Sequence, residues 1–190
     1  EKKDRIAFKE KKVSSWQTTT WGEYRNTIKK MSESLHALGF HYGDKAAIFS
    51  NNCYRWLVAH MATIAAGGAS AGIYPTVSAE QCFFILEHSQ AKVLFIEDLE
   101  RLKSLDKILH KLTNLETIII FNGDTEKNQN NGREVIFSWE KMLKLNTHTT
   151  NEIYNSNLKK QKPNDLATLV YTSGTTGHPK AVMLSHQNIT

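Results

Sequence analysis

The chain has 190 residues, of which 40% are hydrophobic and 23% are charged, and its net charge is +5. These values are ordinary for a globular domain and exclude a chain that is disordered throughout. The two cysteines, Cys53 and Cys82, belong to no CxxC or Cys/His cluster, which excludes a disulfide framework and favours a reducing, intracellular setting. The sequence has no apolar signal core and no spanning segment, and because it begins without methionine we expect it to be excised from a longer chain.

The N-terminus is rich in basic residues. Six occur within the first twelve positions: Lys2, Lys3, Arg5, Lys9, Lys11 and Lys12. Such a segment can touch acidic lipid or nucleic acid, but interruption by three acidic residues favours a solvated strand or tail. No nucleic-acid-binding motif accompanies it, so we expect no nucleic-acid partner. We treat residues 1–15 as a basic N-terminal segment and residues 16–190 as an incomplete domain.

Helical and extended segments alternate along the rest of the chain. Helices are predicted where apolar residues recur every three or four positions, and strands where short apolar runs occur. In chain order, these are a helix over 23–38, a strand over 46–50, a helix over 53–66, a strand over 69–74, a helix over 79–89, a strand over 92–96, a helix over 99–109, a strand over 117–121, a helix over 138–145 and a strand over 165–171.

Several of these boundaries carry a local signal. Gly39 closes the first helix, and Ser78 with Gln81 forms a capping box that opens the third. The helix over 53–66 carries a single charge, so it should be sandwiched between other elements. The alternation implies an α/β fold of βαβ units, with a largely parallel sheet covered on both faces. The polar stretches 122–134 and 146–163 are interpreted as surface segments.

The stretch YTSGTTGHPKAVMLSH, from Tyr171 to His186, follows the last predicted strand, a common position for ligand loops in α/β sheets. Its glycines let the backbone approach an anion, its hydroxyl groups donate hydrogen bonds, and Lys180 adds a mobile positive charge. These features suit a polyphosphate. The loop is not a Walker A sequence, because Lys180 lies three residues past Gly177 and is followed by Ala181. A plain Ser/Thr/Gly-rich turn is the alternative interpretation.

The segment LVYTSGTTGHPK, residues 169–180, resembles the phosphate-binding signature of the adenylate-forming superfamily of acyl-CoA synthetases, luciferases and carrier-protein adenylation domains. Residues 182–188 are similar to the next strand and helix start of that family, and residues 19–56 to its entry region. Residues 65–98 look most like the long-chain fatty acyl-CoA synthetases of the bubblegum type. The resemblance runs from about Trp16 to the last residue, which implies part of the large N-terminal domain of such an enzyme.

This resemblance implies a site and a reaction. In the family, the loop grips the β- and γ-phosphates of ATP while a fatty carboxylate attacks the α-phosphate, and coenzyme A captures the acyl-adenylate. Magnesium accompanies the ATP. The residues carried over to phosphate binding are Thr172, Ser173, Gly174, Thr175, Thr176, Gly177 and Lys180. Lys180 is also the catalytic residue, Pro179 would shape the loop, and no residue of the chain is assigned as a metal ligand.

One position departs from the family pattern, because Ala181 stands where the family usually has glycine. If that position needs a positive φ, alanine costs about 1–2 kcal/mol, whereas an extended backbone makes the change nearly silent. The family's magnesium-binding glutamate, ribose-binding aspartate and C-terminal catalytic lysine would lie beyond Thr190. The chain is therefore expected to stop inside an active site.

The other candidate residues have simpler interpretations. His60 and the two cysteines are interpreted as core residues, and Glu87 and His88 are neighbours on a helix that do not face each other for acid-base work. His186 has two open interpretations: a substrate-side role implied by the resemblance, or helix capping beside Ser185.

Three functions stay open. The first is the N-terminal part of an ATP-dependent long-chain fatty acid–CoA ligase, in which residues 1–190 alone are inactive. The second is a truncated product that acts only as a binding or interaction module, and the third is an adenylating enzyme for another acid. For the first, we expect fatty acid and coenzyme A as substrates and a cytoplasmic protein with peripheral contact to intracellular membranes.

Overall fold

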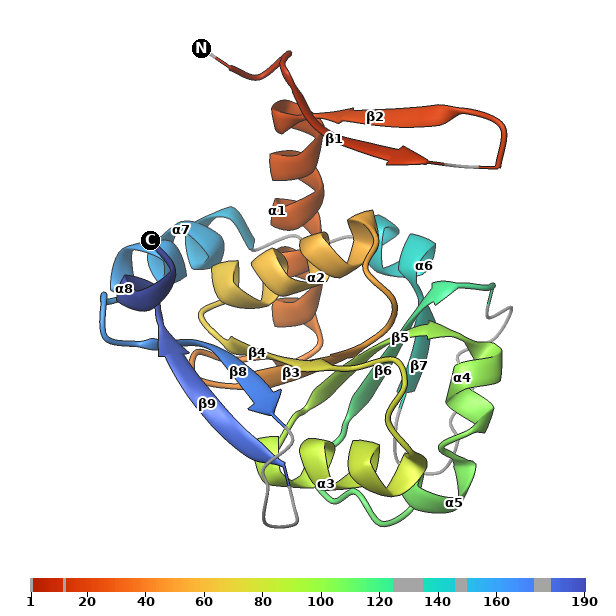
Figure 1. Ribbon diagram of the computed structural model, residues 1–190. Coiled ribbons are helices and arrows are strands. Elements are labelled where there is room, and N and C mark those ends of the chain that lie inside the picture. The colour runs from red at the N-terminus through yellow and green to blue at the C-terminus, as the bar shows by residue number, and fades with distance from the viewer. Residues whose placement is uncertain (1, 12, 125–134, 146–149, 173–178) are drawn as a thin grey trace.

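The computed structural model describes residues 2–11, 13–124, 135–145, 150–172 and 179–190 (Figure 1). Within these ranges a seven-stranded sheet has the order β7-β6-β5-β3-β4-β8-β9. Neighbouring strands are parallel from β7 to β8, and β9 pairs with β8 in the antiparallel direction. Its strands are β3 (Lys45–Phe49), β4 (Ala69–Ile73), β5 (Val93–Asp98), β6 (Thr117–Asn122), β7 (Val135–Ser138), β8 (Leu166–Thr172) and β9 (Lys180–Ser185). The predicted α/β fold with a largely parallel sheet is confirmed.

Helices cover both faces of this sheet (Figure 1). On one face lie α1 (Trp21–Ala37), α2 (Tyr54–Ala65), α6 (Trp139–Lys144) and α7 (Thr150–Lys160). On the other lie α3 (Ala79–Ser89), α4 (Leu99–Lys103) and α5 (Asp106–Leu109), while the short α8 (His186–Ile189) follows β9. Each central strand contributes side chains to the hydrophobic cores on both faces of the sheet, because successive side chains point to opposite faces. In β3, for example, Ala47 packs toward α3 and Ile48 toward α1 and α2.

The predicted helix boundaries rest on local hydrogen bonds. At the end of α1, the N–H of Gly39 donates to His36 and that of Phe40 to Leu35, the two bonds of a Schellman motif, and Gly39 has a φ of 85°. At the start of α3, Ser78 and Gln81 form the expected capping box. The helix α2 is sandwiched only in part, because Met61 remains 38% exposed.

The structure differs from the expected secondary structure in three places. The helix predicted over 99–109 is two short helices, α4 and α5, separated by a tight turn in which the N–H of Leu105 donates to Leu102. The turn forms because the leucines recur every three residues there, which suits 3₁₀ geometry better than an α-helix. The strand β7 was missed because its four residues are too few to show a period.

The third difference concerns the polar stretch 146–163, for which no helix was predicted and where residues 150–160 form α7. The buried side of α7 includes Tyr154 and Asn157, so an apolar pattern does not reveal it. The Asn157 side chain donates to the backbone oxygen of Ala66 at 3.0 Å, which satisfies the end of α2. The other polar stretch, 122–134, lies outside the described residues after Asp124.

An antiparallel hairpin of β1 (Ile6–Lys11) and β2 (Trp16–Thr20) precedes α1 and lies beyond its first turn, away from the sheet (Figure 1). The sequence did not predict this hairpin as a unit. No helix in the described part of the chain combines the length and the apolar character that crossing a bilayer requires.

Candidate functional site

The parallel strands β3, β4 and β8 end at one edge of the sheet, and a cavity of about 210 Å³ opens there. It lies between the N-terminal part of α2 and the ends of β4 and β8. Its walls include Asn52 and Trp56 from the α2 side and Gly72, Tyr74 and Val170 from the strand side. This is where open α/β sheets bind ligands.

The two ends of the predicted phosphate loop lie in β8 and β9. Thr172 ends β8, Lys180 begins β9, and the two residues are direct partners across the antiparallel pair. Both side chains are exposed. The structure therefore fixes the two ends of the loop next to each other. Ser173, Gly174, Thr175, Thr176 and Gly177 lie outside the described residues, so their proposed phosphate contacts stay predictions.

Strand register places Thr172 and Lys180 on the cavity side of the sheet. Side chains alternate along a strand, so Val170, which lines the cavity, shares its face with Thr172. Lys180 lies opposite Thr172 and therefore belongs to the same face. The hydroxyl of Thr172 and the ammonium group of Lys180 thus lie on the same face of the sheet as the cavity, and both are donors that suit a phosphate.

The opposite face of β8 and β9 is packed. Tyr171 and Ala181 are cross-strand partners that contact the core under α3. The hydroxyl of Tyr171 lies 3.0 Å from Nδ1 of His88, which stacks on Phe84. His88 therefore holds the end of β8, a role that the sequence did not indicate.

Ala181 has no positive φ, since Gln90 is the only non-glycine residue with one in the described part of the chain. Its extended backbone holds alanine without the strain that a positive φ would cause. If the protein carries out the adenylation that the sequence resemblance implies, we expect Ala181→Gly to change its rate less than tenfold, in steady-state kinetics with saturating ATP. A larger gain would mean that alanine strains the loop.

A polar network ties three neighbouring loops of this edge together. Arg101 donates to the backbone oxygen of Pro75 at 2.8 Å and pairs with Glu97 at 3.0 Å. Glu97 also accepts hydrogen bonds from the side chain and the backbone N–H of Asn51. The segments after β3 and β4 are thereby fastened to β5 and α4, which fixes the shape of the cavity rim.

Partial burial by itself raises the pKa of Glu97, but the hydrogen bonds from Asn51 and the charge of Arg101 outweigh it and hold this pKa below the ordinary 4.5. A carboxyl group with a depressed pKa stabilises the fold above its unfolded-state pKa, and this contribution is lost as the pH falls through the folded-state pKa. We therefore expect Glu97→Gln to lose stability at neutral pH and to show a shallower acid dependence than the wild type. Urea unfolding between neutral pH and pH 3 measures this, with the exposed Glu100→Gln as the control. An unchanged acid slope would contradict the role of Glu97.

His186 lies at the other end of β9 from Lys180, six residues or roughly 20 Å along the strand. Its N–H donates to the backbone oxygen of Asp165, and Ser185 caps α8 together with Asn188. The structure therefore does not bring His186 and Lys180 together. The substrate-side role of His186 stays a prediction.

The remaining candidates have structural partners. His60 is half-buried, stacks on Trp56 and has Nδ1 2.7 Å from Oγ of Ser70, and burial lowers its pKa. Burial raises the pKa of the Cys82 thiol to about 12, which fits its interpretation as a core residue. Cys53 is partly exposed at the start of α2.

The described residues fit ATP phosphates better than they fit a metal ion. Thr172 and Lys180 provide donors on the cavity side of the sheet, whereas no group of three or more His, Cys, Asp or Glu residues in the described ranges could hold a metal.

The chain is similar in sequence to known proteins. Residues 1–190 match the profile of the protein family described as AMP-binding enzyme. The long-chain-fatty-acid–CoA ligase ACSBG2 of Rattus norvegicus is 34% identical over 185 residues, which cover 97% of this chain and 27% of that protein. The ligase of the same name from Xenopus laevis is 30% identical over 187 residues, covering 98% of this chain and 25% of that protein. The chain thus spans about a quarter of the length of these relatives.

Solved structures share the fold. Acetoacetyl-CoA synthetase from Streptomyces lividans superposes with a TM-score of 0.76 at 23% identity, over 92% of this chain and 27% of that one. The anthranilate CoA ligase AuaEII in complex with anthranoyl-AMP has a TM-score of 0.72 at 20% identity, over 90% of this chain and 30% of that one.

Proposed function

The chain belongs to the AMP-binding enzyme family, and we propose that it is the N-terminal part of an ATP-dependent long-chain fatty acid–CoA ligase. The observation that carries the proposal is the similarity to long-chain-fatty-acid–CoA ligases over nearly the whole chain. The pairing of Thr172 with Lys180 beside a cavity adds physical support.

In the proposed reaction, a carboxylate oxygen of the fatty acid attacks the α-phosphorus of ATP. The bond between this phosphorus and the bridging oxygen breaks, and pyrophosphate leaves with the electron pair. Thr172 donates a hydrogen bond to the phosphates, and the Lys180 ammonium offsets the charge that develops on the departing pyrophosphate. The sulfur of coenzyme A then attacks the acyl carbon, AMP leaves, and the thiol proton passes to solvent.

The cavity beside the loop ends is suited to hold part of a bound adenylate in a fixed orientation. Trp56 and Tyr74 provide aromatic surface, while Asn52 provides an amide near the same wall. The network of Arg101, Glu97 and Asn51 keeps this wall in place, so little reorganisation is needed when the reactants meet.

The test is pyrophosphate exchange by the full-length protein with carboxylic acids of different chain length. We expect exchange with long-chain acids such as palmitate and palmitoyl-CoA formation once coenzyme A is added. Exchange with acetate, benzoate or an amino acid but not with palmitate would favour an adenylating enzyme for another acid. No exchange with any acid would reject the adenylating function.

A second candidate is a catalytically inactive interaction module formed by residues 1–190 alone. The specific observation is that Val170, Val182, Met183 and Ile189 are exposed on or beside β8 and β9. Apolar surface of this kind favours association with other protein surfaces. If residues 1–190 release AMP from ATP and palmitate above a Lys180→Ala background, this candidate is rejected.

A further inference from the structure

His60 on α2 belongs to a chain of hydrogen bonds that joins this helix to two strands of the sheet. Its Nδ1 lies 2.7 Å from Oγ of Ser70 on β4, and the Ser70 hydroxyl donates to Oγ1 of Thr168 on β8 at 3.0 Å. The Thr168 hydroxyl in turn donates to the backbone oxygen of Ser70. Because each hydroxyl has a single proton, Ser70 Oγ can only accept from His60. Neutral His60 therefore carries its proton on Nδ1, and this bond ties its ring to the sheet.

The spacing along α2 matches the spacing along β4 beneath it. Ser70 and Gly72 are two residues apart and so share the strand face that meets α2. Two residues span about 6.6 Å along a strand, and the four residues from His60 back to Trp56 span about 6 Å along a helix. A Cβ atom at Gly72 would lie 3.6 Å from Cζ2 of Trp56. His60 therefore lies over Ser70, and Trp56 lies over Gly72.

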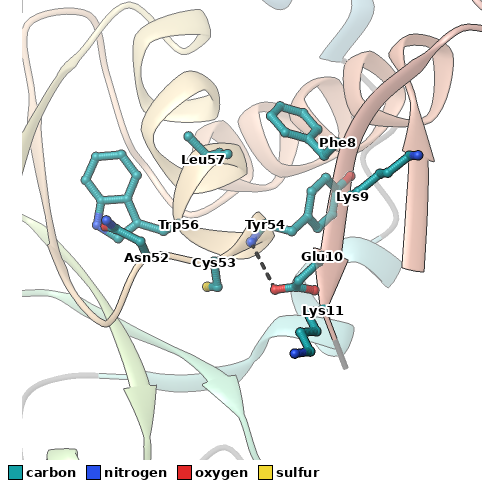
Figure 2. A pocket seen from close by; sticks show the side chains of 9 residues that line it. All are labelled: Phe8, Lys9, Glu10, Lys11, Asn52, Cys53, Tyr54, Trp56 and Leu57. Atoms are coloured by element: carbon teal, nitrogen blue, oxygen red, sulfur yellow. Dashed lines mark hydrogen bonds between the residues drawn. The ribbon is translucent and has the colours of Figure 1, made fainter. Parts of the chain in front are cut away.

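The indole ring of Trp56 forms part of a wall between two cavities. Trp56 and Asn52 line both the cavity of about 210 Å³ at the sheet edge and a cavity of about 740 Å³ between α2 and the β1–β2 hairpin. Figure 2 shows Trp56 pointing away from the hairpin, whereas Tyr54 points toward Phe8 of β1. The position of the Trp56 ring therefore decides where the cavity at the sheet edge ends.

The ring of His60 limits the movement of the Trp56 ring. The two rings stack, with 5.4 Å between their centroids and 23° between their planes. On the strand side, Trp56 meets Gly72, which has no side chain that could hold the indole in one orientation. A smaller side chain at position 60 would leave a gap beside Trp56, and rotation of the indole into this gap would alter the wall between the two cavities.

We propose that His60 is a positioning residue, which holds Trp56 as a wall of the cavity at the sheet edge and so keeps the reactants oriented for adenylation. His60 is not among the described residues that line this cavity, so it acts through Trp56 and Thr168, which do line it. The inference rests on the proposed function, because it assigns a further residue to the same site.

The first test is pyrophosphate exchange with palmitate by variants of the full-length protein. His60→Ala removes the ring and its hydrogen bond, and we expect kcat to fall about tenfold with little change in the KM for ATP, because a misplaced reactant still binds. His60→Phe keeps a ring against Trp56, so its kcat should stay within about threefold of the wild type. Met61→Ala is the control, since Met61 is exposed on the same helix and lines neither cavity, and it should leave both constants unchanged.

A second measurement does not depend on catalysis. The fluorescence of Trp56 is obtained as the difference between each protein and the same protein with Trp56→Phe. Quenching of this fluorescence by acrylamide reports how accessible the indole ring is. We expect stronger quenching in His60→Ala, because the indole is no longer held, and quenching like that of the wild type in His60→Phe.

Three outcomes would count against these claims in different ways. An unchanged kcat in His60→Ala would overturn the positioning role. An equal fall of kcat in His60→Ala and His60→Phe, together with an equal loss of stability in urea, would mean that His60 only supports the fold. If the wild type exchanges pyrophosphate with no acid, the proposed function fails, and the quenching measurement still decides whether His60 holds Trp56.

Discussion

Replacing Lys180 by alanine in the full-length protein is expected to lower kcat for adenylation by about 10²-fold, with a smaller rise in the KM for fatty acid. Lys180 is the first residue of β9, exposed and directly opposite Thr172 on the cavity side of the sheet. Its charge should matter most when pyrophosphate departs, since the negative charge on the leaving oxygen is greatest then. Pyrophosphate exchange and initial-rate kinetics with palmitate measure the two constants separately.

Two controls separate charge from geometry. Lys180→Arg keeps the charge but spreads it over a planar group, so an intermediate rate is expected. Lys30→Ala removes an exposed lysine from α1, far from the sheet edge, and should leave both constants unchanged. An unchanged kcat in Lys180→Ala would remove the residue from the mechanism. A raised KM for ATP with unchanged kcat would mean that Lys180 binds ATP equally well in the ground state and in the transition state and does not accelerate the chemical step.

Sequence patterns predicted the elements that bury an apolar stripe or run. The strands β3 to β6 carry continuous apolar residues such as Ile118, Ile119 and Ile120, because both of their faces are covered. The opening of α3 could be predicted because its capping box is a contact between residues three apart, Ser78 and Gln81. Such signals are local and need no knowledge of the rest of the chain.

The elements that were missed depend on distant partners. Asn157 is buried on α7 because it donates to Ala66 and lies 2.9 Å from Nε2 of His36, contacts that no local pattern contains. The two-stranded hairpin at the N-terminus is held by Phe8 against Tyr24, and its polar strands show little apolar alternation. Tertiary contacts decided these elements, and propensity did not.

In the candidate site too, local sequence signals could be predicted and contacts between distant residues could not. The sequence motif predicted a phosphate loop after the last apolar strand, and the structure describes its two ends, Thr172 in β8 and Lys180 in β9. The cross-strand pairing of Thr172 with Lys180 could not be predicted, because an antiparallel partner for β8 was not expected. The network around Arg101 also escaped prediction, since Asn51, Pro75 and Glu97 belong to segments far apart in sequence.

Stability at the start of β4 depends on a glycine whose neighbours leave no space. A Cβ atom at Gly68 would lie 2.5 Å from the backbone oxygen of Asp44 and 2.6 Å from the ring of Phe40. Phe40 is buried, and the Asp44 oxygen accepts the N–H of Ala69 where β4 begins, so neither can move away cheaply. Gly68→Ala is therefore expected to lower the free energy of unfolding by about 3 kcal/mol, the upper range for overpacking in a core.

Gly43→Ala is the matched control. Gly43 has a φ of 88°, and a Cβ atom there would have no neighbour within 4 Å, so alanine meets only backbone strain, about 1 kcal/mol. Urea unfolding followed by circular dichroism compares the two variants. Equal destabilisation would mean that the chain around Gly68 relaxes and that its close contacts are not limiting. A larger loss of stability in Gly68→Ala than in Gly43→Ala would show that the chain around the start of β4 is rigid. This matters for the cavity, because Gly72 in β4 and Tyr74 just after it line its wall.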